Sequence, residues 1–166
     1  RGKWIIFTNN DTFLLDINAG MFEKDSKLQI PAGAQQGYID GYQFVGNKSG
    51  NLWVFPPTGD FRMLKMIPNL QTTNEKNGIF KIVRAKSGLF YIATYGGGLF
   101  TYNYATGEMQ RFTAEDKNPI IHSNFLLEII TDNTGCIWVS AENAGLSRIT
   151  PADNNAAYYM IDYKQK

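Results

Sequence analysis

Residues 124–151 read NFLLEIITDNTGCIWVSAENAGLSRITP, and this stretch is the repeat on which the rest of the chain is built. An apolar run at 125–130 meets the polar turn at 132–135, a short strand follows at 136–140, and a second turn leads into another strand at 145–149. β-Branched and aromatic residues in runs of four to eight, separated by Asn, Asp and Gly, are typical of strands. The stretch therefore predicts a β-meander.

The same spacing recurs upstream around other turn glycines. Three residues after Gly135, Gly88 and Gly50 stand Trp138, Tyr91 and Trp53. Five residues before these glycines stand Ile130, Val83 and Val45, and eleven residues after them Leu146, Leu99 and Phe61. A fourth copy, shifted by one residue, begins at Gly2 and contains Trp4. The glycines lie 48, 38 and 47 residues apart, which matches the roughly 40 to 50 residues of a four-stranded propeller blade.

The repeat predicts an all-β fold, a partial β-propeller of about four blades, each a four-stranded antiparallel meander. The blades are expected at about 1–36, 37–76, 77–120 and 121–166. In the first copy the expected strands are 3–9, 12–17 and 27–31, around a loop at 18–26. Residues 33–41 are expected to form the crossing to the second blade, whose first repeat strand then runs from Tyr42 to Val45. Residues 156–163 are expected to form the outer strand of the fourth blade.

These residues resemble a known family, the two-component regulator propeller repeat. Its pattern runs as isoleucine, acidic turn, Gly-x-x-Trp, small turn, Gly-Leu and an aromatic strand, which 132–138 and 97–100 fit. Tyr91 replaces the tryptophan and Ala85 the acidic residue in the third copy, and the second copy has Thr58-Gly59-Asp60-Phe61 where Gly-Gly-Leu is expected. The resemblance implies the periplasmic sensor region of a hybrid two-component histidine kinase, with an oligosaccharide ligand and further blades in the parent protein.

Composition narrows the function classes. Of the 166 residues 43% are hydrophobic, and the formal net charge is +1, so no basic stripe favours nucleic acid or an anionic membrane surface. No stretch approaches the roughly 18 apolar residues of a membrane helix, so we expect no membrane insertion by this segment. The start at Arg1, without Met or a signal peptide, indicates a piece of a longer protein. The single cysteine, Cys136, is expected to be a small buried hydrophobic residue.

The residues for catalysis are missing from the sequence. Its one histidine, His122, supports neither a Ser-His-Asp triad nor a histidine-rich metal site. Asp132 beside Asn133 and Thr134 suggests a calcium ligand, but a carboxylate at the start of a turn is better explained by bonds to backbone amides. We therefore expect no enzyme activity, cofactor or metal in this chain.

Ligand binding is the better hypothesis, because propellers carry variable loops on a rigid scaffold. Loops between the second and third strands of a blade, and loops that enter the inner strand, are expected at one face. The candidate ligand-binding residues there are Asn10, Thr58, Tyr95, His122, Asn124, Glu142 and Asn143. Amides and carboxylates suit sugar hydroxyls, and aromatic rings suit the apolar face of a sugar. The repeat aromatics Trp4, Trp53, Tyr91 and Trp138 are expected to fill the space between adjacent blades.

Two other functions stay open at this stage. The chain could belong to a propeller enzyme, such as a polysaccharide lyase or hydrolase, whose catalytic residues lie outside it, or to a structural or protein-interaction propeller. The terminal flanks are apolar, with Trp4, Ile6, Phe13 and Leu15 at one end and Tyr159, Ile161 and Tyr163 at the other. Exposed patches of this kind usually find a partner, which predicts self-association.

Overall fold

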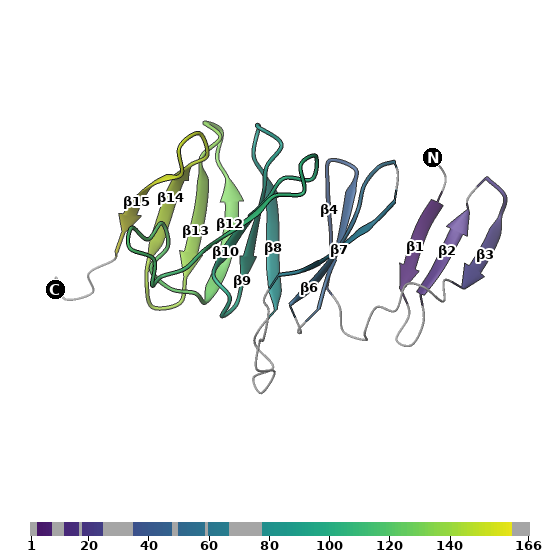
Figure 1. Cartoon of the computed structure of the whole chain (residues 1–166), viewed down its shortest axis with the longest axis horizontal. Helices are drawn as coiled ribbons and strands as arrows, with labels where there is room; N and C mark the ends of the chain where they lie inside the picture. Colours follow the sequence, from purple (N-terminus) through teal and green to yellow (C-terminus); the bar gives the residue numbers. More distant parts are fainter. Residues whose placement is uncertain are drawn as a thin grey trace. The chain divides into compact units, whose positions relative to one another are not determined.

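The computed structural model describes residues 3–7, 12–16, 18–24, 35–47, 50–58, 60–66 and 78–160. Within these residues the chain forms fifteen strands in four antiparallel sheets and no helix (Figure 1), so none of them forms a helix able to span a membrane. Each sheet follows the order of the chain, as the blades of a propeller do. The prediction of an all-β fold built from meander blades is confirmed.

The chain divides into two compact units. The first, Arg1–Asn47 with Asn51–Leu64, holds a three-stranded sheet and most of a four-stranded one. The strands of these two sheets are β1 (Lys3–Phe7), β2 (Thr12–Asp16) and β3 (Met21–Lys24), then β4 (Gln35–Ile39), β5 (Tyr42–Gly46), β6 (Asn51–Phe55) and β7 (Arg62–Lys65).

The second unit, Lys48–Gly50 with Lys65–Lys166, holds two four-stranded sheets. Their strands are β8 (Ile79–Arg84), β9 (Phe90–Thr94), β10 (Leu99–Tyr102) and β11 (Met109–Phe112), then β12 (Leu126–Thr131), β13 (Ile137–Ala141), β14 (Leu146–Thr150) and β15 (Asn155–Tyr159). The outer strand expected at 156–163 thus begins one residue earlier, and residues beyond 160 lie outside the described part.

The third strand of the first sheet is not where the sequence placed it. β3 lies inside the expected loop at 18–26, and the expected strand at 27–31 lies outside the described residues. The cause is a tight turn: the amides of Asn18 and Ala19 both donate to Asp16 Oδ1 at 3.0 Å, and Gly20 adopts a φ of 64°. The chain therefore reverses at once, and Leu15 pairs with Phe22.

The expected crossing at 33–41 is also wrong, because residues 35–39 form β4. Asp40 and Gly41 have φ values of 49° and 81°. Positive φ at both central residues defines the type I′ hairpin turn, for which Asp-Gly is a favoured sequence. β4 then pairs with β5 from Ile39 opposite Tyr42 to Gln35 opposite Gly46. As a result the turn before Gly50 joins the second and third strands of this sheet, whereas the turns before Gly88 and Gly135 join the first and second.

The three repeat turns have the same backbone hydrogen bond. The amides of Asn47, Ala85 and Asp132 donate to the carbonyl four residues later, at 3.0, 2.9 and 2.9 Å, and the glycines 50, 88 and 135 have φ values of 74°, 90° and 90°. Glycine has no Cβ and therefore reaches a positive φ without the steric cost that other residues pay. The spacing of these glycines in the sequence therefore marks the positions at which the chain must turn.

Asp132 uses its carboxylate as the sequence predicted for a turn. Its Oδ1 accepts from the amides of Thr134 and Cys136 at 2.9 and 3.0 Å and from the Thr134 hydroxyl at 2.6 Å, and its Oδ2 accepts from the Trp138 indole at 2.7 Å. These bonds, that of the Thr134 hydroxyl first and that of the Trp138 indole next, hold the pKa of Asp132 well below its usual range. Cys136, which follows the turn, is buried as expected.

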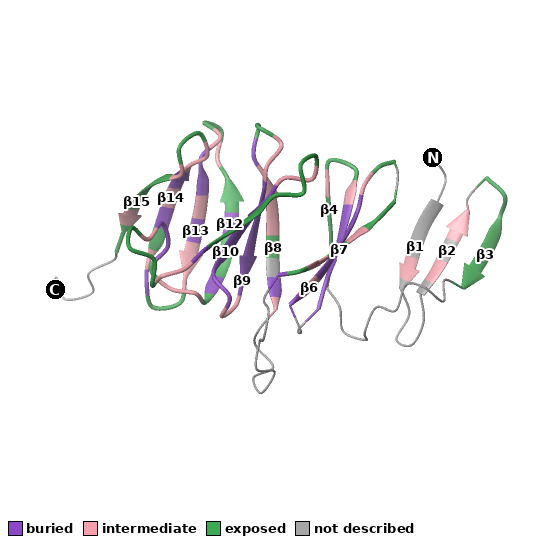
Figure 2. Ribbon diagram, viewed as in Figure 1, coloured by how far each residue is buried: buried purple, intermediate pink, exposed green. Residues whose placement is uncertain are grey.

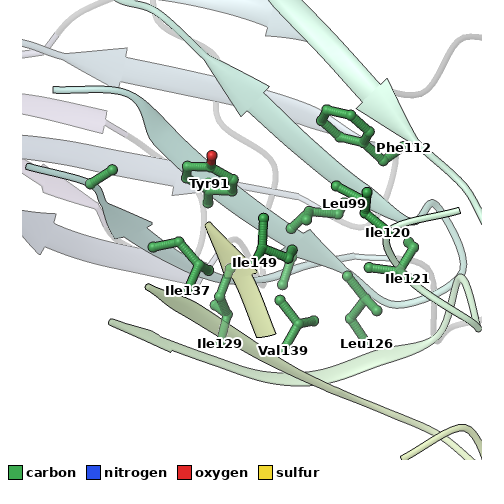
Figure 3. Packing of buried hydrophobic residues seen from close by; sticks show 12 residues of the cluster. Tyr91, Leu99, Phe112, Ile120, Ile121, Leu126, Ile129, Ile137, Val139 and Ile149 are labelled. Atoms are coloured by element: carbon green, nitrogen blue, oxygen red, sulfur yellow. The ribbon is translucent and has the colours of Figure 1, made fainter. Parts of the chain in front are cut away.

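The two sheets of the second unit pack face to face around one core (Figure 3). β12 lies against β8 and β9, and the charges of Lys81 on β8 and Glu128 on β12 pair across the inner strands. The labelled core residues are Tyr91, Leu99, Phe112, Ile120, Ile121, Leu126, Ile129, Ile137, Val139 and Ile149. Since a single antiparallel sheet cannot bury its own apolar face, this stacking is what stabilises the unit.

The repeat aromatics do not share one environment. Trp53 and Tyr91 are 5% and 0% exposed, and the Tyr91 hydroxyl donates to Asn154 Oδ1 at 3.1 Å in the turn between β14 and β15. Tyr91 therefore packs in the core between the two sheets of the second unit. Trp138 does not: it is only partly buried and lies on the face of β13 turned away from the core. The side chain of Trp4 lies outside the described residues.

Replacing Tyr91 should weaken the second unit strongly. Tyr91→Ala removes a fully buried ring and leaves a cavity between the two sheets, at an expected cost of about 3 to 5 kcal/mol in unfolding free energy. Tyr91→Phe loses only the bond to Asn154, about 1 kcal/mol. The control, Met109→Ala on the exposed side of β11, should change stability by less than about 0.5 kcal/mol. Equal urea midpoints for Y91A and M109A would contradict this core.

The Asp132 turn makes stability depend on pH in a defined direction. Because its pKa is lowered on folding, ionised Asp132 contributes stability above its unfolded pKa of about 3.9, and this contribution is lost as the pH falls through the lower folded value. At pH 7 Asp132→Asn should have a lower urea midpoint than the wild type. The gap should narrow steadily below about pH 4; a gap that widens in acid would show that another group carries the effect.

Candidate ligand-binding face

Three loops of the second unit meet at one end of its two sheets. They are the turn between β9 and β10, the connection from β11 to β12, and the turn between β13 and β14. The amides of Gly96 and Gly98 donate to the Asn124 carbonyl at 2.8 and 3.1 Å, and the amide of Glu142 donates to the Phe125 carbonyl at 2.8 Å. The loops that leave second strands and the loop that enters an inner strand thus form one surface, here called the loop face.

Tyr95 and Glu142 meet on the loop face. The Tyr95 hydroxyl donates to Glu142 Oε2 at 2.6 Å, and this bond is the main reason that the pKa of Tyr95 is raised, with burial and the charge of Glu142 adding to it. The Tyr95 ring packs edge-on against Phe125, with centroids 5.1 Å apart. The three loops therefore present a carboxylate beside two aromatic rings.

Asn124 holds the loop face together. Its Oδ1 accepts from the Ala114 amide at 2.9 Å, and its Nδ2 donates to both oxygens of Glu115 at 3.1 and 2.9 Å. The bond from Asn124 is the main cause of a lowered pKa at Glu115. With its oxygen and its amide nitrogen both engaged, Asn124 positions the loops, and Glu115 beside it is a further carboxylate that the sequence prediction did not include.

The other predicted residues lie elsewhere or have structural roles. His122 is exposed and stacks on Tyr158 of β15, with ring centroids 3.8 Å apart. Asn143 forms the β13–β14 turn with a φ of 55°. Thr58 is exposed in the first unit, and Asn10 lies outside the described residues. The structure thus brings Tyr95, Asn124 and Glu142 together on one face of the second unit, whereas His122 packs on β15.

Phe125 is the residue of this face that the sequence did not indicate. It was grouped with the apolar run of the inner strand, but it is 43% exposed while the next residue, Leu126, is fully buried. Phe125 forms an isolated bridge with Tyr95, and the register of β12 shifts between Leu126 and Glu128. Neighbouring residues of a strand point to opposite sides. If Leu126 faces the core, Phe125 and Leu127 must therefore face away from it, and this alternation is the sequence signal for the exposure of Phe125.

The arrangement suits recognition of a polar ligand with apolar faces. An exposed ring offers a stacking surface, and the nearby carboxylates accept hydrogen bonds from ligand hydroxyls. In the described part of the chain no three His, Cys, Asp or Glu residues are placed to hold a metal ion. Tyr95, Phe125 and Glu142 are the groups through which the face would contact a ligand.

No protein-family model matches the sequence, and no curated protein matches it. Among solved structures, the chain is similar to the extracellular domain assigned to the hybrid two-component system BT3049 of B. thetaiotaomicron, with a TM-score of 0.63 and 15% identity over 96% of this chain and 23% of that one. It is also similar to the extracellular domain assigned to the hybrid two-component system BT4673 of the same organism, with a TM-score of 0.59 and 16% identity over 96% and 23%.

The dihydro-heme d1 dehydrogenase NirN is similar as well, with a TM-score of 0.56 and 16% identity over 94% of this chain and 34% of that one. At such identities the likeness shows a shared fold. The chain spans about a quarter of the length of the two extracellular domains.

The loop face should depend on the glycine that lets the two loops approach. A Cβ at Gly98, whose φ is 85°, would lie 2.4 Å from the Phe112 carbonyl oxygen and 3.3 Å from Asn124 Oδ1. We expect Gly98→Ala to cost about 2 to 4 kcal/mol in unfolding free energy, from strain and overpacking. Gly78→Ala, where nothing lies within 4 Å, should cost about 1 kcal/mol or less. Urea unfolding of both variants measures the difference, and a stable G98A would show that the loops pack differently.

Proposed function

We propose that the chain is part of the periplasmic sensor region of a hybrid two-component regulator, and that its loop face recognises an oligosaccharide. The proposal rests on the resemblance of the repeat to sensor propellers and on the fold shared with extracellular domains assigned to such systems. In this proposal ligand binding outside the membrane changes the activity of a kinase that belongs to the parent protein and not to this chain.

The observation that carries the ligand class is the Tyr95, Phe125 and Glu142 group. A sugar ring has an apolar face that stacks on an aromatic side chain, and a rim of hydroxyls that donate to a carboxylate. Glu142 is exposed and accepts from Tyr95 through one oxygen. The other oxygen of this exposed carboxylate is the one that would accept from a sugar hydroxyl, and the exposed Phe125 ring lies next to Tyr95. An oligosaccharide fits this chemistry better than a phosphate or a purely apolar ligand.

The test is titration of the folded chain with a panel of plant and host oligosaccharides, followed by calorimetry and by NMR chemical shifts. For a sugar that binds, Phe125→Ala and Glu142→Gln should each weaken the affinity at least about tenfold, which is about 1.4 kcal/mol. Glu108→Gln, in the β10–β11 turn at the other end of the sheet, is the matched control and should leave the affinity unchanged.

Two outcomes would overturn the proposal. One is the absence of binding across the panel, and the other is binding that E142Q and E108Q affect equally. Sugar turnover during the titration would instead point to a propeller enzyme, so each mixture should be analysed for cleavage products.

A further inference from the structure

Glu142 is held beside the aromatic rings of the loop face by both its backbone and its side chain. Its amide donates to the Phe125 carbonyl at 2.8 Å, and its carboxylate accepts from the Tyr95 hydroxyl at 2.6 Å. The turn that carries Glu142 is closely packed, because a Cβ at Gly145 would lie 2.2 Å from the Tyr159 carbonyl oxygen. The carboxylate is therefore already in place for a ligand that stacks on Phe125, and binding needs little ordering of this loop.

The carboxylate is open to solvent although the strands of the neighbouring sheet are not. Figure 2 shows β9 and β10 buried throughout, whereas residues 142–143 of the β13–β14 turn are exposed. Phe125 is 43% exposed. A charged ligand at this surface would feel the charge of Glu142 at short range, and dissolved salt would screen that interaction.

The bond from Tyr95 leaves the negative charge of Glu142 in place. A phenol hydroxyl is a neutral donor, so it satisfies one carboxylate oxygen without cancelling the charge. Three causes raise the pKa of Tyr95, namely the bond to Glu142, then burial, then the charge of Glu142. Tyr95 therefore keeps its proton at neutral pH and remains a donor to Glu142.

Two other carboxylates of the second unit lie beside cations. Glu128 pairs with Lys81, and Asp132 Oδ2 lies 4.0 Å from Arg148 Nε. Among the described residues, none forms an ion pair with Glu142. Glu142 thus differs from these two carboxylates, because the partner of its side chain is a neutral group.

The connection from β11 to β12 carries the other acidic side chains of the loop face, and cations lie near them in the chain. Lys117 directly follows Glu115 and Asp116, and Arg111 precedes them in β11. Hydrogen bonds are the main cause of the lowered pKa values of Glu115 and Asp116, and the positive charge of Arg111 adds to their effect. Two carboxylates thus stand beside two cations here, whereas the turn at 142–145 carries Glu142 as its one charged residue.

We propose that Glu142 is a specificity-determining residue of the loop face, and that it excludes sugars that carry carboxylate or sulfate groups. Hydroxyls of an uncharged sugar donate to its carboxylate. An acidic sugar stacked on Phe125 would instead bring like charges together, which binding sites use to reject wrong partners. The ligand class is then an uncharged oligosaccharide. This inference rests on the proposed function, because it concerns the ligand of the same site.

The test compares tetrasaccharides of glucose, mannose and galactose with the same tetrasaccharides after oxidation of their primary hydroxyls to carboxylates. In calorimetry at about 0.02 M salt, an uncharged form that binds should do so at least about tenfold more tightly than its acidic form, which is about 1.4 kcal/mol. The difference should shrink at about 0.5 M salt, because salt screens interactions between exposed charges.

Glu142→Gln separates charge from structure. The variant keeps an acceptor oxygen for the Tyr95 hydroxyl but loses the negative charge, so the affinities of the two forms should come within about threefold of each other. Glu108→Gln removes the same charge from the β10–β11 turn at the other end of the sheet, and it should keep the wild-type ratio. Circular dichroism of both variants should show the wild-type strand spectrum.

The possible outcomes distinguish this inference from the proposed function. An acidic form that binds as tightly as its uncharged form would overturn the inference and leave sugar recognition standing. A wild-type ratio that E142Q retains would also overturn it, because a purely structural role of Glu142 weakens both forms alike. If E142Q binds too weakly to measure, the salt dependence of the wild type decides. Binding by neither form of any tetrasaccharide would remove the proposed function and this inference together.

Discussion

Packing of β8–β11 against β12–β15 is the interaction on which the described structure of the second unit depends. Neither sheet buries its apolar side alone, and Tyr91, which is fully buried between them, also bonds to the β14–β15 turn through its hydroxyl. This contact fixes both the distance between the sheets and their alignment along the strands. Because the two sheets are aligned in this way, the loops at the strand ends lie side by side, and Tyr95 of one sheet bonds to Glu142 of the next.

The aromatic position of the repeat is fully buried in one copy and only partly buried in the next, because different groups surround it. Tyr91 and Trp138 follow their turn glycines at the same distance, but among the residues described in the second unit only Tyr91 has a further sheet packed against it. Trp138 is instead held by Asp132, Tyr159 and Arg148 of its own sheet. Asp132 is thus both a turn residue and the partner of the aromatic side chain, a pairing that the third copy lacks because alanine occupies its position. The difference links the local turn to the exposure of the aromatic side chain in each copy.

Period and turn chemistry were enough to predict the fold class, the repeat turns and most strands, because a positive φ at glycine and strand alternation are local constraints. The errors were local too. The Asp40-Gly41 dipeptide is a hairpin signal, but it lies in a glycine-rich stretch that was interpreted as a connection. The tight turn at Asp16 shortened a loop that was expected to run to residue 26. At the loop face, Tyr95 and Glu142 were predicted. Phe125 was not, because its place beside Tyr95 depends on a bridge to another sheet and a register shift in β12 that no spacing reveals.

Residue-by-residue amide hydrogen exchange tests the central claim most directly, since local opening follows the burial that each strand has. In dilute, monomeric chain, the amides of β9 and β10, buried on both faces, should exchange most slowly in the second unit. Exchange should be faster in β13 and fastest in β15, whose residues are largely exposed. Equal protection of β9 and β15, or greater protection of β15, would contradict an account in which stacking of the two sheets around Tyr91 holds the unit together.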